Sequence, residues 1–279
     1  MTEANLTSAE VSFILYLSRY QDDTGRICGV HYKSVCKDLH ISYQTFYDIK
    51  NSLIEKGLIK QEKMTYIDYD ITIVGNDCSD LEQTLKERYI NTNHAIFYSP
   101  EFHKMKAKEK ILAMLFMVRT FTNKASYQIL TNNFYDKFCR ILSVTQRAIR
   151  TYLTSLRKFF AIGIKDHKYF ITPKKNLYRK PGQAREEDNY NNNIVQVVCR
   201  RNKIDYSDRE INDTVGLIRQ YESWDKENII LRITRAIIES ISGFLPFDRK
   251  DKPKLAPSYI HKLLRRDLNL RGDPTEAFI

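Results

Sequence analysis

The feature that most constrains the fold is an internal repeat with a period of 103 residues. Shifting the chain by 103 positions without a gap places apolar residues opposite apolar residues, and one hydroxyl residue opposite another. The matched pairs are Tyr32/Tyr135, Val35/Phe138, Cys36/Cys139, Leu39/Leu142, Ile41/Val144, Ser42/Thr145, Phe46/Ile149, Ile49/Tyr152, Leu53/Leu156 and Ile59/Ile162. The polar residues between them differ. One core carried twice under two different surfaces indicates a duplicated domain.

The first copy, residues 1–98, predicts helices over residues 11–20, 32–39 and 43–56. Ser42 is a good N-cap for the third helix, because its hydroxyl can accept a hydrogen bond from a free N–H of the first turn. Phe46, Ile49 and Leu53 then follow at spacings of three and four, which predicts a buried stripe. Gly57 supplies the left-handed residue that ends the helix. Residues 58–63 and 66–74 predict a β hairpin.

The second copy, residues 99–182, predicts the same series of elements. Its helices are expected over residues 107–121, 133–142 and 145–160, and its hairpin strands over 161–165 and 168–172, around Asp166 and His167. Both copies therefore read as helix, helix, turn, helix and hairpin.

The run from Ser42 to Ile59, S-x-x-T-F-x-x-I-x-x-x-L-x-E-K-G-L-I, resembles the third helix and hairpin entry of the winged helix-turn-helix superfamily. That resemblance implies a mainly α fold with small β wings. It also implies that the helix carrying Tyr43 to Asn51 enters the major groove of DNA. A winged helix kept for protein contacts is the alternative for this first copy. The tandem arrangement is similar to that of the two-winged-helix initiators of plasmid replication.

The positive charge of the chain is concentrated in its middle third. The net charge is +11, and residues 99–183 carry 18 Lys and Arg against 4 Asp and Glu, a net of +14. Residues 1–98 have a net charge of −4, and residues 184–279 of +1. A basic segment of this kind is typical of a protein with a polyanionic partner. We therefore expect the second copy to dominate DNA affinity, while the acidic first copy binds more weakly, occupies a second half-site or dimerises.

The third helix of the second copy carries side chains that are typical of base recognition. Arg makes paired hydrogen bonds with guanine, and Gln with adenine, in the major groove. The expected base-reading residues of the second copy are Gln146, Arg147, Arg150, Thr151 and Thr154. Their candidates in the first copy are Tyr43, Gln44, Thr45 and Tyr47, on a helix that also carries Asp48 and Glu55.

Further residues around these helices are expected to contact phosphates, which position a protein on DNA without reading its sequence. They are Thr145, Lys158, Lys165, His167, Lys168, Lys174, Lys175, Arg179 and Lys180 in the second copy, and Lys60 and Lys63 in the first. A solvated basic face with no ligand is the alternative.

Residues 183–204 are expected to form a linker, because their beginning, QAREEDNYNNN, is polar and lacks periodicity. Residues 205–279 predict a helical domain, with Ser207 and Glu210 forming a capping box. Within it, Trp224, Tyr259, Ile260, Leu263 and Leu264 resemble the C-terminal helical domain of DnaD-type primosomal proteins over about 60 residues. A small helical domain for oligomerisation or partner binding is the alternative.

Several kinds of chemistry are not expected. Nine glycines form no G-x-x-x-x-G-K loop, and no His-x-His pair accompanies the eighteen tyrosines, which argues against an ATPase and a rolling-circle nickase. Cys28, His31, Cys36 and His40 are close enough in sequence for zinc, but the second copy repeats only the cysteine of Cys36. We expect no metal, no cofactor and no enzymatic activity.

The predicted location is the cytoplasm, in association with the nucleoid. The five cysteines are scattered and odd in number, which suits a reducing compartment. No run approaches the roughly 20 apolar residues of a membrane span, and residues 1–10 lack the pattern of a signal peptide.

The sequence thus predicts a sequence-specific double-stranded DNA-binding protein that acts as a transcriptional regulator. The alternatives are a replication initiator or primosomal origin-binding protein of a plasmid or phage, and a winged-helix interaction scaffold. The expected partners are duplex DNA, a second copy of the chain, and transcription or replication machinery bound through the C-terminal domain.

Overall fold

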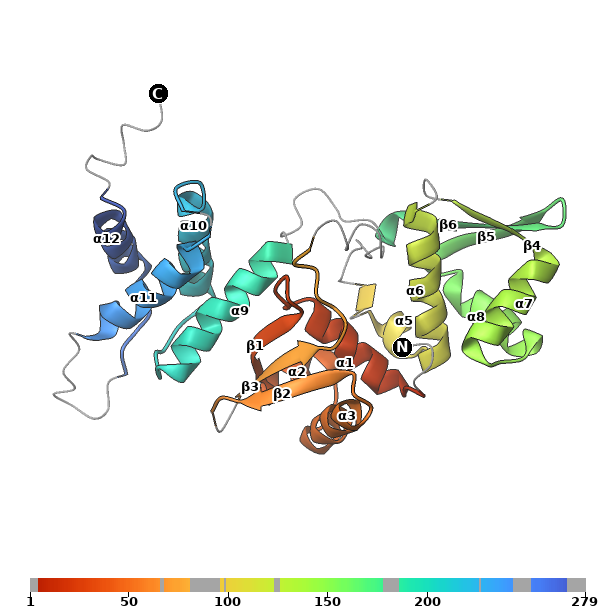
Figure 1. Ribbon diagram of the computed structural model, residues 1–279, viewed down its shortest axis with the longest axis horizontal. Helices are drawn as coiled ribbons and strands as arrows, with labels where there is room; N and C mark the ends of the chain where they lie inside the picture. The colour runs from red at the N-terminus through yellow and green to blue at the C-terminus, as the bar shows by residue number, and fades with distance from the viewer. Residues whose placement is uncertain are drawn as a thin grey trace, which may run out of the picture. The chain divides into compact units, whose positions relative to one another are not determined.

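The chain is mainly helical, with two small antiparallel sheets of three strands each (Figure 1). The computed structural model describes residues 5–65, 68–80, 96–97, 99–122, 126–177, 186–225, 227–242 and 252–269. The chain divides into two compact units, Met1–Gln183 and Ala184–Ile279. No helix among the described residues is long and apolar enough to cross a membrane.

The first half of the first unit follows the order helix, strand, helix, helix, strand, strand. Its elements are α1 (Ser8–Ser18), β1 (Arg26–His31), α2 (Tyr32–Leu39), α3 (Tyr43–Glu55), β2 (Ile59–Lys63) and β3 (Asp68–Ile73). The strands form one antiparallel sheet in the order β1-β3-β2. The hairpin of β2 and β3 agrees with the sequence prediction, whereas strand β1 was not predicted.

The second half repeats this order. After a short helix α5 (Pro100–His103), its elements are α6 (Ala107–Thr122), β4 (Tyr127–Leu130), α7 (Thr131–Leu142), α8 (Gln146–Leu156), β5 (Phe160–Lys165) and β6 (Lys168–Pro173). The sheet order is β4-β6-β5, the counterpart of the first sheet. A 3₁₀ turn, η2 (Lys175–Leu177), follows.

The turn before the third helix is the same in both copies. His40 directly follows α2 and Ser143 directly follows α7 as the C-cap, and both residues adopt a left-handed conformation, with φ of 52° and 50°. The hydroxyls of Ser42 and Thr145 then accept from the third backbone N–H beyond them, which caps α3 and α8. These two positions differ by the predicted offset of 103 residues.

A buried glutamate joins the first helix to the third helix in each copy. Glu10 accepts from the backbone N–H of Thr7 and from the hydroxyl of Ser52, both at 2.6 Å. Glu109 accepts in the same way from Lys106 at 2.7 Å and from Ser155 at 3.2 Å. Each carboxylate therefore caps one helix and holds the orientation of another.

The first copy adds a cation to this link. The ammonium group of Lys56 lies 2.6 Å from Glu10 Oε1. Burial raises the pKa of Glu10, but hydrogen bonds from Lys56, Ser52 and Thr7 outweigh that effect and leave the pKa below its usual value.

The two copies share one continuous hydrophobic core. Helix α1 packs against α6, where the Lys110 ammonium group donates to the carbonyl of Ser8 at 3.1 Å and to the hydroxyl of Ser12 at 2.7 Å. The Ser8 hydroxyl donates in turn to the carbonyl of Met105 at 2.8 Å. Lys110 is only 1% exposed, and its burial lowers its pKa to about 8.

The second unit contains four helices among its described residues. They are α9 (Glu186–Arg201), α10 (Asp208–Tyr221), α11 (Ile229–Ser242) and α12 (Pro257–Asp267). Their core is formed by apolar side chains from all four, including Val195, Ile218, Ile237 and Ile260. The capping box of Ser207 and Glu210 is present at the start of α10.

The prediction of a linker over residues 183–204 is wrong for most of that segment, because helix α9 occupies Glu186–Arg201. Asp188, buried in the second unit, pairs with Arg219 of α10 at 2.8 Å. Val195 and Cys199 are fully buried in the core of this unit. Packing thus stabilises a helix whose asparagines have a low intrinsic helix propensity.

We expect Glu10→Ala to lower the free energy of unfolding of the first unit by about 2–4 kcal/mol, because it removes a helix cap and leaves buried donors without an acceptor. Urea denaturation followed by circular dichroism measures this loss. The matched control is Glu55→Ala, at an exposed carboxylate of α3. A loss no larger than that of the control would contradict the structural role of Glu10.

We expect the stability of the wild-type chain to rise with pH relative to Lys110→Met. The folded-state pKa of Lys110, about 8, lies below the usual value of 10.5, so the unfolded state binds more protons between these two pH values. The unfolding free energy of the wild type, minus that of Lys110→Met, should therefore increase between pH 8 and pH 10.5. A difference that stays constant over this range would contradict the assignment of a buried, poorly solvated ammonium group.

Candidate nucleic-acid interface

The outer face of α8 displays all five side chains that were predicted to read bases. Gln146, Arg147, Arg150, Thr151 and Thr154 are exposed. The opposite face is buried, as the spacing of its apolar residues requires, and consists of Ile149, Tyr152, Leu153 and Leu156.

The five side chains are not equally free to bind. The hydroxyl of Thr151 donates to the carbonyl of Arg147, and that of Thr154 donates to the carbonyl of Arg150, both at 3.2 Å. Both threonines therefore use their hydroxyl proton in a hydrogen bond within the helix. Each leaves a methyl group and an acceptor oxygen for a ligand.

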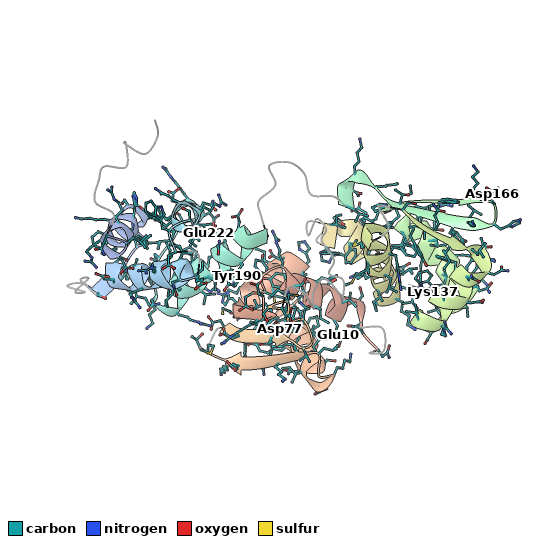
Figure 2. The ribbon with its side chains drawn as sticks, turned by 45° about the horizontal axis from the view of Figure 1, so that its top comes forward. Glu10, Asp77, Lys137, Asp166, Tyr190 and Glu222 are labelled. Carbon is teal, nitrogen blue, oxygen red and sulfur yellow. The ribbon has the colours of Figure 1, made fainter. Side chains whose placement is uncertain are left out.

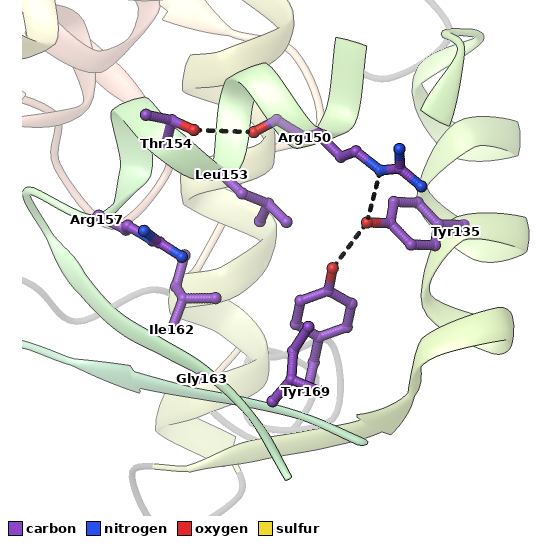
Figure 3. A pocket seen from close by; sticks show the side chains of 9 residues that line it. Tyr135, Arg150, Leu153, Thr154, Arg157, Ile162, Gly163 and Tyr169 are labelled. Carbon is purple, nitrogen blue, oxygen red and sulfur yellow. Dashed lines mark hydrogen bonds between the residues drawn. The ribbon is translucent and has the colours of Figure 1, made fainter. Parts of the chain in front are cut away.

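Arg150 is held against the preceding helix of its own copy. Its Nε donates to the hydroxyl of Tyr135 on α7 at 3.4 Å, and its guanidinium carbon lies 5.6 Å from the centre of the Tyr135 ring. The Tyr135 hydroxyl is also 2.7 Å from that of Tyr169 on β6, so the three side chains form a chain of hydrogen bonds (Figure 3). Burial, followed by the bond to Tyr135, raises the pKa of Tyr169 to about 12.

The predicted phosphate contacts surround this helix. Lys158 follows α8, Lys165 and Lys168 lie on the β5–β6 hairpin, and Lys174 and Lys175 follow β6; all five are exposed. The hydroxyl of Thr145 already accepts from the N–H of Ala148. Arg179 and Lys180 lie outside the described residues.

The hairpin itself ends in a tight turn. Asp166 and His167, with φ of 49° and 57°, form the two-residue connection, and Figure 2 labels Asp166 at its tip. Two successive positive φ values match the twist of the flanking strands. The exposed His167 side chain thus lies at the far end of the hairpin.

The cations around α8 have no carboxylate partners in the part of the chain that the structure describes. No ion pair there involves Arg147, Arg150, Arg157, Lys158 or Lys168. In the first copy, by contrast, Arg26 pairs with Asp70 at 2.9 Å, and Lys56 pairs with Glu10. The positive charge of these five side chains is therefore not neutralised by an ion pair among the described residues.

The corresponding face of the first copy is aromatic. Tyr43, 55% exposed, lies 4.7 Å from Tyr47 and 5.1 Å from Tyr32 between ring centres. Lys50 is buried behind them, with its ammonium group 4.5 Å from the centre of the Tyr69 ring.

The remaining polar candidates of the first copy are partly engaged with their own helix. Gln44 donates to Asp48 at 2.8 Å, and the hydroxyls of Thr45 and Ser42 share a hydrogen bond of the same length. Lys60 and Lys63 are exposed on β2.

Sequence reasoning missed Tyr135, Arg157 and Tyr169 as parts of the site. The offset of 103 residues does align Tyr135 with Tyr32, but it explains both as core positions. The role of Tyr135, Arg157 and Tyr169 in the site depends on the position of the hairpin beside α8. Residue spacing along the chain does not show that position.

Within the described ranges, no three His, Cys, Asp or Glu side chains come together in an arrangement that could hold a metal ion. No model of a known protein family matches the chain, and a search of curated proteins finds no similar sequence.

Proposed function

We propose that the protein is a sequence-specific double-stranded DNA-binding protein with two winged helix-turn-helix domains, at residues 1–98 and 99–182. The observation that carries this proposal is the outer face of α8. Its arginines, and the lysines around it, are exposed and have no carboxylate partner among the described residues. A helix of this kind fits the major groove, whose width admits one α-helix.

In this proposal the second copy supplies most of the affinity. Arg147 bonds to the O6 and N7 atoms of a guanine, and Gln146 bonds to an adenine edge. The hairpin lysines and Lys174 and Lys175 bind phosphates and fix the register of α8 on the duplex.

The first copy plays a different part. Its net charge of −4 and its internally paired Arg26 and Lys56 leave little positive charge for phosphates. It either binds a second half-site weakly through Gln44 and its tyrosines, or forms the contact between two chains. The helical second unit then connects the DNA-bound protein to its partners.

We propose transcriptional regulation as the biological role, in the cytoplasm and on the nucleoid. The second candidate is an initiator that marks a replication origin of a plasmid or phage. It is favoured by the two copies packed in one unit and by the primosomal resemblance around Trp224 and Tyr259. Genome-wide footprinting separates the two, since scattered promoter sites indicate a regulator and an iterated array beside its own gene indicates an initiator.

We expect binding to duplex DNA to weaken steeply with salt. Each phosphate neutralised by a cation contributes about −0.9 to the slope of log affinity against log salt concentration. Fluorescence anisotropy with native DNA fragments measures this slope. Binding that is absent or independent of salt would instead support an interaction scaffold and overturn the proposal.

We expect Arg147→Ala to cost about 1–3 kcal/mol at the specific site and to relax specificity, because it removes a base contact. Lys174→Ala should weaken binding to all sequences alike. Competition between specific and random duplexes measures both effects. If Arg147→Ala has no effect while Gln44→Ala abolishes specific binding, the first copy is the reading domain and the division of roles is reversed.

A further inference from the structure

A hollow of about 550 Å³ lies between α8 and the β5–β6 hairpin (Figure 3). Its polar lining consists of Tyr135 of α7, Arg150 and Thr154 of α8, Arg157 at the end of α8, and Tyr169 of β6. Its apolar lining includes Ile162 and Ile164 of β5, and Ile164 is 61% exposed.

The hollow offers more hydrogen-bond donors than acceptors. The pKa of Tyr169, at about 12, keeps this hydroxyl protonated at neutral pH. The Tyr135 and Tyr169 hydroxyls have two protons between them, and one of these is used in the bond that joins them. In the described part of the chain the other proton has no protein acceptor, so it remains available to a ligand.

The two arginines add further donors. Arg150 uses only its Nε on Tyr135, which leaves both terminal nitrogens of its guanidinium group for a ligand. Arg157 also lines the hollow and is exposed. No carboxylate lines the hollow. A site that presents guanidinium and hydroxyl donors without a carboxylate is suited to an anion with several acceptor oxygens.

We propose that this hollow binds a phosphodiester group of the DNA backbone, with Arg150 and Arg157 on its phosphate and Ile162 and Ile164 against the adjoining deoxyribose. The inference rests on the proposed function, since it specifies how the second copy holds duplex DNA. It assigns Arg150 a backbone contact in place of the base contact that its position on α8 predicts.

The first copy supports this assignment by contrast. At the offset of 103 residues, Tyr47 stands in place of Arg150, and Ile54 in place of Arg157. The third helix of the first copy therefore lacks both guanidinium groups that line the hollow of the second copy.

Tyr135 also prepares Arg150 for binding. Its hydroxyl and its ring both contact the guanidinium group, which restricts a long and otherwise mobile side chain before the ligand arrives. Ordering of this kind reduces the entropy that is lost on binding.

The test compares Arg150→Ala with Arg209→Ala, which removes a 91% exposed arginine of the second unit. Fluorescence anisotropy over a salt series is recorded with the specific duplex and with a random one. We expect Arg150→Ala to make the log–log slope shallower by about 0.9 and to weaken both duplexes about five-fold near 0.15 M salt. Arg209→Ala should change neither quantity.

A second measurement uses duplexes in which single phosphates are replaced by neutral methylphosphonates. At one position the replacement should weaken the wild type about five-fold and weaken Arg150→Ala by a smaller factor, since the substitution has already removed one of the two arginines that contact this phosphate. Tyr135→Phe keeps the ring but not the hydroxyl. In this variant the methylphosphonate at that same position should cause a smaller loss of affinity than in the wild type.

Two results would overturn the inference while the proposed function stands. One is an unchanged slope with a loss confined to the specific duplex, which marks Arg150 as a base reader. The other is an equal loss for wild type and Arg150→Ala at every methylphosphonate position. A wild type that shows no salt-dependent binding would overturn both the proposed function and this inference.

Discussion

The exposed face of each third helix depends on one buried carboxylate. Glu10 and Glu109 each cap the first helix of their copy and accept from a serine of the third helix. A carboxylate in so little water is stable only while its donors stay in place. The link therefore fixes how α3 and α8 are rotated about their own axes, and with that which of their side chains reach solvent.

On this shared frame the two copies have diverged at their surfaces. The same position on the third helix is Tyr47 in one copy and Arg150 in the other. Tyr47 contacts Tyr43 of its own helix and Tyr69 of the hairpin, whereas Arg150 contacts Tyr135 of the preceding helix. The first copy therefore has an aromatic face, and its Arg26 and Lys56 are paired internally. The second copy has a cationic face without carboxylate partners among the described residues. Duplication preserved the apolar contacts, and the outer positions, which the core does not constrain, were free to change.

Much of this could be predicted because it is local. The capping serine and threonine, Gly57 with its φ of 68° and the bounds of α2 follow from short-range patterns. Strand β1 was missed because it is short and interrupted at Gly29, and it is held by Asp70 from a distant strand. Helix α9 was missed because tertiary packing outweighs its polar composition. Neither glutamate link was predicted, because Glu10 and Glu109 bond to serines 42 and 46 positions away and lie 99 residues apart, outside the offset of 103.

The joint at Lys110 has a consequence for the geometry of any target. A symmetric dimer presents the same surface twice about a two-fold axis, and its DNA sites tend to be palindromes for that reason. Here two unlike copies are fused in one chain, share one core and are tied through Ser8 and Ser12. Such a unit is asymmetric, so in the proposed DNA-binding role a single molecule would lie on a duplex with a defined polarity and distinguish upstream from downstream.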